Sequence, residues 1–436
     1  MTSRTSIQNT LVEHTLQLIE EVFGVLDQSC YAVRLWDGTT WKPASGTDIR
    51  CTIVLRHPGA LRKMLSTPTE LNMCECYLYG DVDLEGDIEA IMPVGEQLVG
   101  QPRSFWDKLW IGRQLLKLPQ IKDCDSISHR RPKLSGKEHS VERDTAAVTH
   151  HYNVSNEFYA TWLDRNMVYS CAVFDSQQES LDAAQERKLD YICRKLRLKP
   201  GDRMLDIGCG WGGLILHAVK NYGVEALGIT LSEPQAQRAN ERIFAENLQG
   251  KCRVQVIDYR HLDKVEGFDK IASIGMVEHV GEDYLNEYFA TAYRLLKPGG
   301  VFLNHGIGNL AGRPSKSPND KPGFVRTYVF PDSSLPSITA VMAAAEKNQF
   351  EPRDLESLRE HYAITLRHWI KRLEANEKDA KKEVGDVTYR VWRLYLASCA
   401  YWFAVGYISV YQTLLAKRID GRSGLPLRRD DWYTNT

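Results

Sequence analysis

The sequence predicts an α/β protein in which a doubly wound, mostly parallel sheet follows a smaller α+β domain. From residue 180 onward, apolar runs typical of buried strands alternate with amphipathic helical spacing. Within the segment 201–214, GDRMLDIGCGWGGL, a strand-like run ends in a glycine-rich turn before a helix. The chain has 436 residues, more than one hydrophobic core usually fills, so two domains are expected.

Composition divides the chain into three parts. We predict a first domain over 1–121, a linker over 122–147 and a second domain over 148–436. The linker is polar and charged and has almost no apolar periodicity. Apolar spacing in the first domain predicts a helix at 7–27, strands at 31–36 and 51–56, a helix at 58–66 and a strand-turn-strand passage at 77–86.

Charge and cysteine usage limit the class of protein. Lys and Arg number 55 against 56 Asp and Glu, so the chain has no overall positive charge that would attract nucleic acid. We therefore expect no nucleic-acid partner. Acidic residues interrupt the apolar positions of the N-terminus, so we expect neither a signal peptide nor a membrane span. The ten cysteines have no paired C-x-x-C frame, which predicts reduced thiols in a cytoplasmic protein and no metal site.

Titratable side chains gather at one edge of the predicted sheet. Asp258 ends one strand-like run, Glu278 follows the next, and His305 lies near the end of the one after. The carboxyl ends of parallel strands form the ligand-binding edge of a doubly wound sheet, and the glycine-rich turn lies at the same edge. Each residue alone is more often structural, but together they predict a functional site. The strands are expected at 224–230, 252–258, 268–276 and 301–307, and the helices at 180–197, 213–221, 232–247 and 283–296.

The end of the second strand separates two cofactor classes. A dinucleotide fold places an acidic residue there, about 20 residues after the glycines, to bind ribose hydroxyls. Here the strand ends in GITLS, and the first acid is Glu233, already in the next helix. The glycines at 208, 210, 212 and 213 also lack the dinucleotide spacing. A nucleotide-type cofactor other than a dinucleotide is therefore expected, and a tight turn without a ligand is the alternative.

Eight ordered motifs resemble the cyclopropane-fatty-acyl-phospholipid synthase family, an S-adenosylmethionine-dependent family that includes the mycolic acid cyclopropane synthases. They spread across residues 150 to 415, whereas residues 1–121 resemble, more weakly, a lipid-carrier-like domain. The motifs are YSCAVF at 169–174, LDIGCGWGGL at 205–214, GITLSEPQ at 228–235, DYR at 258–260, GMVEHVG at 275–281, FLNHGI at 302–307, YVFPDSSLPSI at 328–338 and HYAITLRHW at 361–369.

The resemblance implies a class I methyltransferase fold and two groups of site residues. The positions that would bind S-adenosylmethionine are Tyr169, Ser170, Gly208, Gly210, Thr230, Leu231, Gln235 and Asp258, with Asp258 near the adenine. The positions that would bind a bicarbonate ion beside the reacting methyl group are Cys171, Gly275, Glu278, His305, Ile307 and Tyr362.

The implied reaction transfers a methylene unit from S-adenosylmethionine to the cis double bond of a phospholipid acyl chain. Attack by the alkene leaves a carbocation, which requires a dry pocket in which aromatic faces stabilise the charge. Bicarbonate would remove the proton that allows the ring to close, and its closeness to Glu278 predicts a shared proton. Cys171 would act through its backbone, which argues against a Cys-His-Glu covalent catalyst. The aromatic candidates are Tyr159, Phe174, Tyr328 and Tyr362.

Two further functions remain open from the sequence. The same carbocation could lose a different proton, giving a methyl- or methylene-branched chain. A non-catalytic lipid carrier could keep the same fold, although Glu278, His305 and Tyr362 argue against that function.

Two apolar stretches bear on how a lipid would be reached. Residues 104–119 form a broad apolar face with added Lys and Arg, typical of a helix on a membrane surface or of a helix docked in the core. Residues 385–418 predict a helical cover over an acyl-chain tunnel, because Arg390, Arg393 and Gly406 interrupt a membrane helix. We expect peripheral contact with the inner face of the membrane, and a homodimer is compatible with the sequence.

Overall fold

The computed structural model describes residues 2–26, 30–44, 46, 48–120, 154–262, 267–310, 323–331 and 334–433. The chain forms two compact units. Unit 1 comprises Met1–Arg131, Lys321–Val329 and Gly385–Tyr401, and unit 2 comprises Pro132–Asp320, Phe330–Val384 and Trp402–Thr436. The predicted linker at 122–147 lies outside the described residues.

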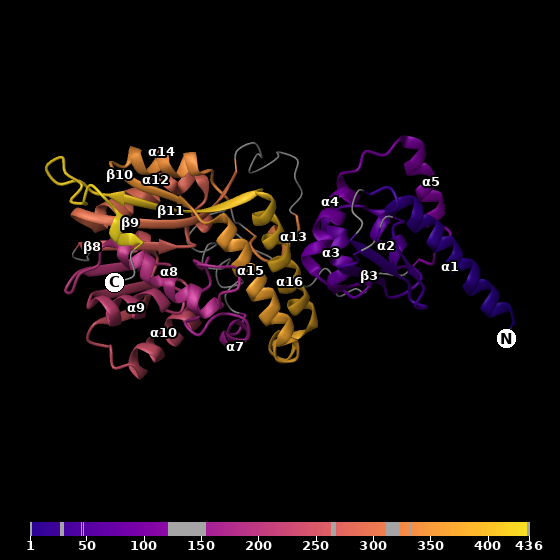
Figure 1. Cartoon of the computed structure of the whole chain (residues 1–436), viewed down its shortest axis with the longest axis horizontal. Helices are drawn as coiled ribbons and strands as arrows, with labels where there is room; N and C mark the ends of the chain where they lie inside the picture. The colour runs from indigo at the N-terminus through magenta and orange to yellow at the C-terminus, as the bar shows by residue number, and fades with distance from the viewer. Residues whose placement is uncertain are drawn as a thin grey trace. The chain divides into compact units, whose positions relative to one another are not determined.

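Unit 1 is built on a four-stranded sheet in the order β2-β1-β3-β4, so the predicted α+β character is confirmed. Strand β3 of this sheet and helices α1 to α5 are labelled in Figure 1. Its strands are β1 (Tyr31–Arg34), β2 (Thr40–Trp41), β3 (Cys51–Leu55) and β4 (Val82–Gly86). Its helices are α1 (Thr2–Phe23), α2 (Ala60–Ser66), α3 (Glu70–Leu78), α4 (Met92–Gly100), α5 (Phe105–Leu115) and α13 (Phe324–Tyr328). The strand-turn-strand prediction for 77–86 is wrong in its first half. Thr69 caps α3 by accepting a hydrogen bond from the Asn72 N–H, and the helix runs on to Leu78.

A helical segment far along the chain completes unit 1. Residues 385–401 belong to α16 (Glu377–Val405), and Gly385 breaks its helical geometry with φ of 77° and ψ of 167°. Arg390 forms an ion pair with Asp83, and Arg393 donates to the Leu84 carbonyl. The sequence boundaries treat each domain as one continuous segment, whereas the compact units combine segments from both halves of the chain.

Unit 2 contains a seven-stranded sheet in the order β10-β11-β9-β8-β5-β6-β7. The four pairings from β9 to β7 are parallel, and only β11 and β10 run antiparallel to their neighbours. The predicted doubly wound, mostly parallel α/β fold is therefore confirmed. The strands are β5 (Arg203–Ile207), β6 (Glu225–Thr230), β7 (Cys252–Val256), β8 (Phe268–Ile274), β9 (Leu296–Asn309), β10 (Glu351–Ser357) and β11 (Ile408–Ala416). The helices include α7 (Asn156–Ala160), α8 (Leu181–Leu196), α9 (Gly213–Tyr222), α10 (Glu233–Ala245), α11 (Val277–Val280), α12 (Leu285–Leu295), α14 (Ile338–Lys347) and α15 (Arg359–Ala375).

The helical prediction for 385–418 is wrong at its C-terminal end. Helix α16 stops at Gly406, which adopts a left-handed conformation with φ of 77° and ψ of 32°. The residues that follow, ISVYQTLLA, are rich in β-branched and aromatic side chains and form β11. Within the described parts of the chain, no helix combines the length and apolar character needed to cross a membrane.

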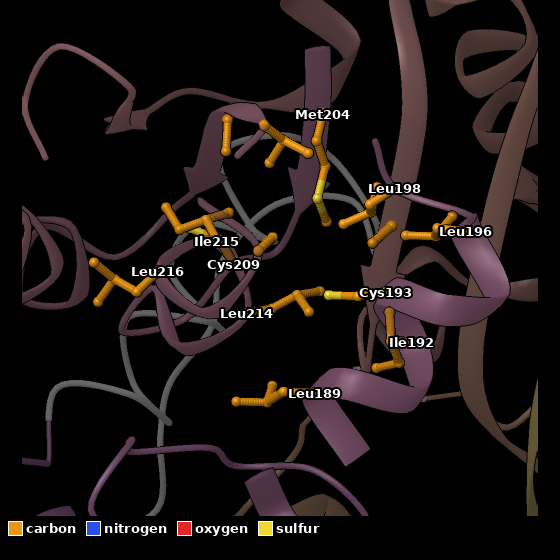
Figure 2. Close-up of a cluster of buried hydrophobic side chains, with 14 of the residues drawn as sticks. Leu189, Ile192, Cys193, Leu196, Leu198, Met204, Cys209, Leu214, Ile215 and Leu216 are labelled. Carbon is orange, nitrogen blue, oxygen red and sulfur yellow. The ribbon is translucent and has the colours of Figure 1, made fainter. Parts of the chain in front are cut away.

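Successive side chains of β5 point to opposite faces of the sheet, and each face has its own hydrophobic cluster. Met204 packs in the cluster with α8 and α9, and Leu205 packs in the cluster with α12 and α14. Figure 2 shows Cys193 of α8 directed toward Leu214 of α9 in the first cluster. These clusters fix the end of β5 and the start of α9, and the glycine-rich turn connects the two.

The close packing beneath this turn predicts a stability effect. A Cβ atom at Gly228 of β6 would lie 2.7 Å from the Cys209 sulfur and 3.2 Å from Ile215 Cδ1. Gly228→Ala should therefore overpack the core and cost about 1–3 kcal/mol. Thermal unfolding followed by circular dichroism should show a lower Tm than for Gly250→Ala, because a Cβ at Gly250 meets no heavy atom within 4 Å. Equal Tm values for the two variants would contradict the packing argument.

Candidate active site

The glycine-rich turn forms the floor of a cavity of about 160 Å³ at the carboxyl edge of the sheet. Gly208 and Gly210 have φ of 79° and 53°, a region that L side chains rarely adopt. A Cβ on Gly208 would also approach Met276 Cβ to 3.2 Å. The turn thus needs glycine both for its backbone conformation and to keep the cavity open.

All eight residues expected to bind the cofactor line this one cavity, namely Tyr169, Ser170, Gly208, Gly210, Thr230, Leu231, Gln235 and Asp258. Thr230 Oγ1 donates to Gln235 Oε1 at 2.9 Å, which ties the end of β6 to the first turn of α10. Asp258 forms an ion pair with Arg260 at 2.7 Å, and both residues line the cavity. The structure brings the eight together, and their individual roles stay predictions.

Two buried charged residues that sequence reasoning did not assign also line the cavity. The Lys188 ammonium donates to Ser170 Oγ at 2.8 Å, and burial lowers its pKa to about 8. Burial raises the pKa of Asp206 to about 7 against the opposing effect of Lys188, and Asp206 Oδ1 has no hydrogen-bond partner. Lys188 lies on the apolar face of an amphipathic helix, and a lysine at such a position is a sequence signal for a buried functional cation.

Four of the six predicted catalytic residues are linked by backbone and carboxylate hydrogen bonds. The Gly275 N–H donates to the His305 carbonyl at 2.8 Å, and the Ile307 N–H donates to Glu278 Oε1 at 2.7 Å. A Cβ on Gly306 would overlap Val277 Cγ1, so only glycine lets β9 approach α11 this closely. The sequence thereby places the Glu278 carboxyl against the end of β9.

Burial shifts the pKa values of Glu278 and His305 toward their uncharged forms. Burial raises the pKa of Glu278 to about 7, despite the hydrogen bond from Ile307, and lowers the pKa of His305 to about 3. Gln412 Nε2 lies 3.2 Å from His305 Nδ1. An amide N–H can only donate, so the proton of the neutral ring is assigned to Nε2. Glu278 Oε2 and His305 Nε2 are both buried without a hydrogen-bond partner.

Cys171 and Tyr362 meet at the backbone of Leu358. The Leu358 carbonyl accepts from the Cys171 thiol at 3.7 Å and from the Tyr362 N–H at 3.1 Å. The Leu358 N–H donates to the Val410 carbonyl of β11, and Val410 pairs in register with Ile307 of β9. Backbone contacts therefore connect Cys171 and Tyr362 with the strand that carries His305 and Ile307. Burial raises the pKa of the Cys171 thiol well above its usual value, so a thiolate nucleophile is disfavoured.

The four predicted aromatic candidates occupy different surroundings. Tyr362 packs 4.6 Å from the Phe403 ring, and Phe174 stacks on His368 at 5.4 Å. Tyr159 lies 4.8 Å from the Trp211 ring, beside the cavity wall. All of these pairs belong to unit 2. Tyr328 belongs to unit 1, where its hydroxyl donates to Glu75 at 2.8 Å, and the structure does not assign it to this site.

The fold and cavity are those of a class I S-adenosylmethionine-dependent methyltransferase. The mycolic acid cyclopropane synthase CmaA1, solved in complex with SAH and CTAB, is 35% identical with a TM-score of 0.58. The match covers 62% of this chain and 97% of that structure. The predicted enzyme class and the use of S-adenosylmethionine are thereby confirmed.

The chain belongs to the family described as mycolic acid cyclopropane synthetase, whose model matches residues 139–413. A second model, described only as a domain of unknown function, matches residues 18–106. A probable fatty acid methyltransferase of Pseudomonas putida is 38% identical over 404 residues, 92% of this chain and 95% of the relative. The cyclopropane-fatty-acyl-phospholipid synthase of Escherichia coli strain K12 is 35% identical over 329 residues, 75% of this chain and 77% of the relative. The predicted family is confirmed, and the protein is an S-adenosylmethionine-dependent transferase that acts on lipids.

The burial of Glu278 predicts a pH-dependent stability effect. Its pKa is about 7 in the folded chain against an ordinary value of 4.5, so the folded state keeps a proton that the unfolded state has lost. The contribution of Glu278 to the free energy of unfolding should fall as pH rises from 4.5 to 7, by about 3 kcal/mol. Glu278→Gln removes this cost, and its Tm relative to wild type should rise between pH 5 and pH 8.

Differential scanning calorimetry over this pH range tests the effect, with the exposed Glu282→Gln as the control for loss of a carboxyl on the same segment. A difference in Tm between Glu278→Gln and wild type that stays constant from pH 5 to pH 8 would contradict it.

Proposed function

We propose that this enzyme transfers a methylene unit from S-adenosylmethionine to the cis double bond of a phospholipid acyl chain, forming a cyclopropane ring. The observation that carries the proposal is the pair of buried groups Glu278 and His305, whose pKa values are shifted toward the uncharged forms and which each have an unpartnered polar atom. The name of the Escherichia coli relative supports the choice of a phospholipid substrate.

The cofactor cavity contains groups that fit the amino-acid end of S-adenosylmethionine, which carries a carboxylate and an ammonium group. Lys188 and Ser170 together would bind a carboxylate, and the unpartnered Asp206 Oδ1 would accept from an ammonium group. Bound S-adenosylmethionine supplies an electrophilic methyl group on its sulfonium. The glycine turn and Asp258 then orient the remainder of the molecule along the edge of the sheet.

We assign a bicarbonate ion to the buried, unpartnered polar atoms of His305 and Glu278. The neutral His305 ring would donate through Nε2–H, and a protonated Glu278 would donate through Oε2. Keeping Glu278 protonated avoids two adjacent full anions in a buried site. Bound bicarbonate supplies a base beside the transferred carbon. Gln412 keeps the His305 proton on Nε2, where it is needed.

The chemistry requires a strong electrophile and a dry site. The π electrons of the alkene form the new bond to the methyl carbon, and the carbon–sulfur electron pair stays on sulfur. The carbocation left on the acyl chain must be kept from water, and the aromatic faces of Tyr362 and Phe174 would stabilise it. Loss of a proton from the new methyl group then leaves the electron pair that closes the ring.

Our proposal extends to where the enzyme works. Its substrates are acyl chains of membrane phospholipids, and its methyl donor is a cytoplasmic metabolite. We therefore place it at the inner face of the membrane, in peripheral contact with the lipid. A homodimer stays a prediction.

A branched product is the second candidate. The Pseudomonas putida relative, which aligns over nearly its whole length, carries the name fatty acid methyltransferase. Loss of a proton from a neighbouring chain carbon instead of the new methyl group would give a methyl branch from the same carbocation. The two products differ only in which proton the base removes.

Proton NMR of the extracted lipid product tests the proposal. Incubation of the enzyme with S-adenosylmethionine and unsaturated phospholipid vesicles should give the upfield signals of cyclopropane ring protons. Glu278→Gln should lose at least about tenfold in turnover, since a positioned acid or base contributes that much or more. Olefinic or branched-methyl signals in place of ring protons would select the second candidate. Full turnover by Glu278→Gln would contradict the role of Glu278, and no lipid product from the wild type would favour the lipid-carrier function.

The role of Lys188 predicts a loss of cofactor affinity. Lys188→Met removes the buried cation, so SAH should bind about 10- to 100-fold more weakly in a calorimetric titration. Lys195→Met is the matched control, because Lys195 is equally buried on α8 but pairs with Glu356. Equal SAH affinity for Lys188→Met and Lys195→Met would contradict the assignment.

A further inference from the structure

Helix α5 of unit 1 presents an apolar stripe to solvent. The exposed fractions are 71% for Phe105, 74% for Trp106, 44% for Leu109, 43% for Trp110 and 68% for Leu116. Phe105 and Leu109, like Trp106 and Trp110, lie four positions apart, and Leu116 follows Leu109 by seven positions at the C-cap, so the five share one side of the helix. Large apolar side chains gathered in this way mark an interaction surface. The apolar face predicted for 104–119 is divided in the structure, because Phe105, Leu109, Trp110 and Leu116 are exposed whereas Leu115 is buried in unit 1.

The opposite side of α5 holds the helix in unit 1. Leu115 and Leu118 are buried, and the Arg62 guanidinium donates to the Leu118 carbonyl at 2.8 Å. Ser104 and Asp107 form a capping box that fixes the first turn. The stripe is therefore carried by an anchored helix, and its outward direction is set by the packing beneath it.

A groove of about 720 Å³ runs along the same helix. Its apolar lining comes mainly from leucines, including Leu65, Leu98 and Leu109. The charged residues among its described lining are all cationic, namely Arg62, Arg103, Lys108 and Arg113. An apolar floor with only positive charges suits an amphiphile that carries a negative head group.

We propose that the α5 stripe and this groove dock unit 1 on the surface of an anionic phospholipid bilayer. Tryptophan and phenylalanine prefer the boundary between head groups and acyl chains, and nearby Lys and Arg are attracted to anionic lipid. This proposal rests on the proposed function, because an enzyme that acts on membrane phospholipids needs a surface that binds the bilayer.

Charge favours a membrane over a second copy of this chain. A symmetric dimer through this face would bring the same patch together twice, so that the cations at Lys108 and Arg113 would face their own copies. Like charges in an interface are unfavourable. A bilayer that contains phosphatidylglycerol offers the opposite charge over the whole area.

Vesicle co-sedimentation tests the proposal without any turnover. Saturated vesicles of phosphatidylcholine, with or without phosphatidylglycerol, cannot be methylated, so binding is measured independently of the reaction. Wild type should bind the phosphatidylglycerol vesicles more tightly and bind them less as salt rises. The double variant Trp106→Ser with Trp110→Ser should bind at least about tenfold more weakly.

Matched controls separate this surface from general effects. Phe244→Ser changes a side chain that is 70% exposed on α10 of unit 2, and it should bind vesicles as wild type does. Lys108→Glu with Arg113→Glu should remove the preference for phosphatidylglycerol, whereas Arg253→Glu with Lys382→Glu, exposed on unit 2, should keep it.

Three outcomes would overturn the proposal. The first is equal vesicle binding by wild type and the double tryptophan variant, and the second is equal binding of wild type to both kinds of vesicle. The third is a wild-type dimer that becomes a monomer in the double tryptophan variant, as measured by light scattering, while vesicle binding stays unchanged. SAH affinity, measured on the same variants, should not change. If vesicle binding fails while the lipid product still forms in detergent micelles, the docking surface is wrong and the proposed function stands.

Discussion

The burial of Glu278 at the end of β9 is the constraint on which the site depends. Its carboxyl accepts a hydrogen bond from Ile307 at 2.7 Å, and α11 can come this close only because residue 306 is glycine. Burial lowers the pKa of His305 to about 3, which leaves its ring neutral, and raises the pKa of Glu278 to about 7, so that this carboxyl can gain or lose a proton near neutral pH. Our proposal assigns a bound anion to these two groups, because Glu278 Oε2 and His305 Nε2 are both buried without a hydrogen-bond partner.

The cofactor cavity contains a different pair of buried titratable groups. Lys188 and Asp206 are also buried, but they offer one positive and one negative group to the same small space. A zwitterionic amino-acid end would complement both charges at once. The glycine turn lines the same cavity as this pair.

Residues in local motifs could be predicted from the sequence. The strand, the glycine turn and the helix after it are consecutive, so the location of Gly208 and Gly210 follows from the pattern alone. Lys188 and Gln412 reach the site only through tertiary packing, and neither lies in a recognised motif. Strand β11 was missed because its apolar composition suits a helix equally well, and its pairing with β9 comes from distant residues. Burial of α5 could not be decided because one apolar face fits either a core or a membrane.

The most direct test of the account follows the hydrogens of the transferred group. S-adenosylmethionine carrying three deuterium atoms on its methyl group is incubated with the enzyme and an unsaturated phospholipid, and the deuterium content of the product is measured by mass spectrometry. Deprotonation of the transferred carbon predicts a product that retains two deuterium atoms. Retention of all three would show that the proton leaves another carbon, and would contradict ring formation at this site.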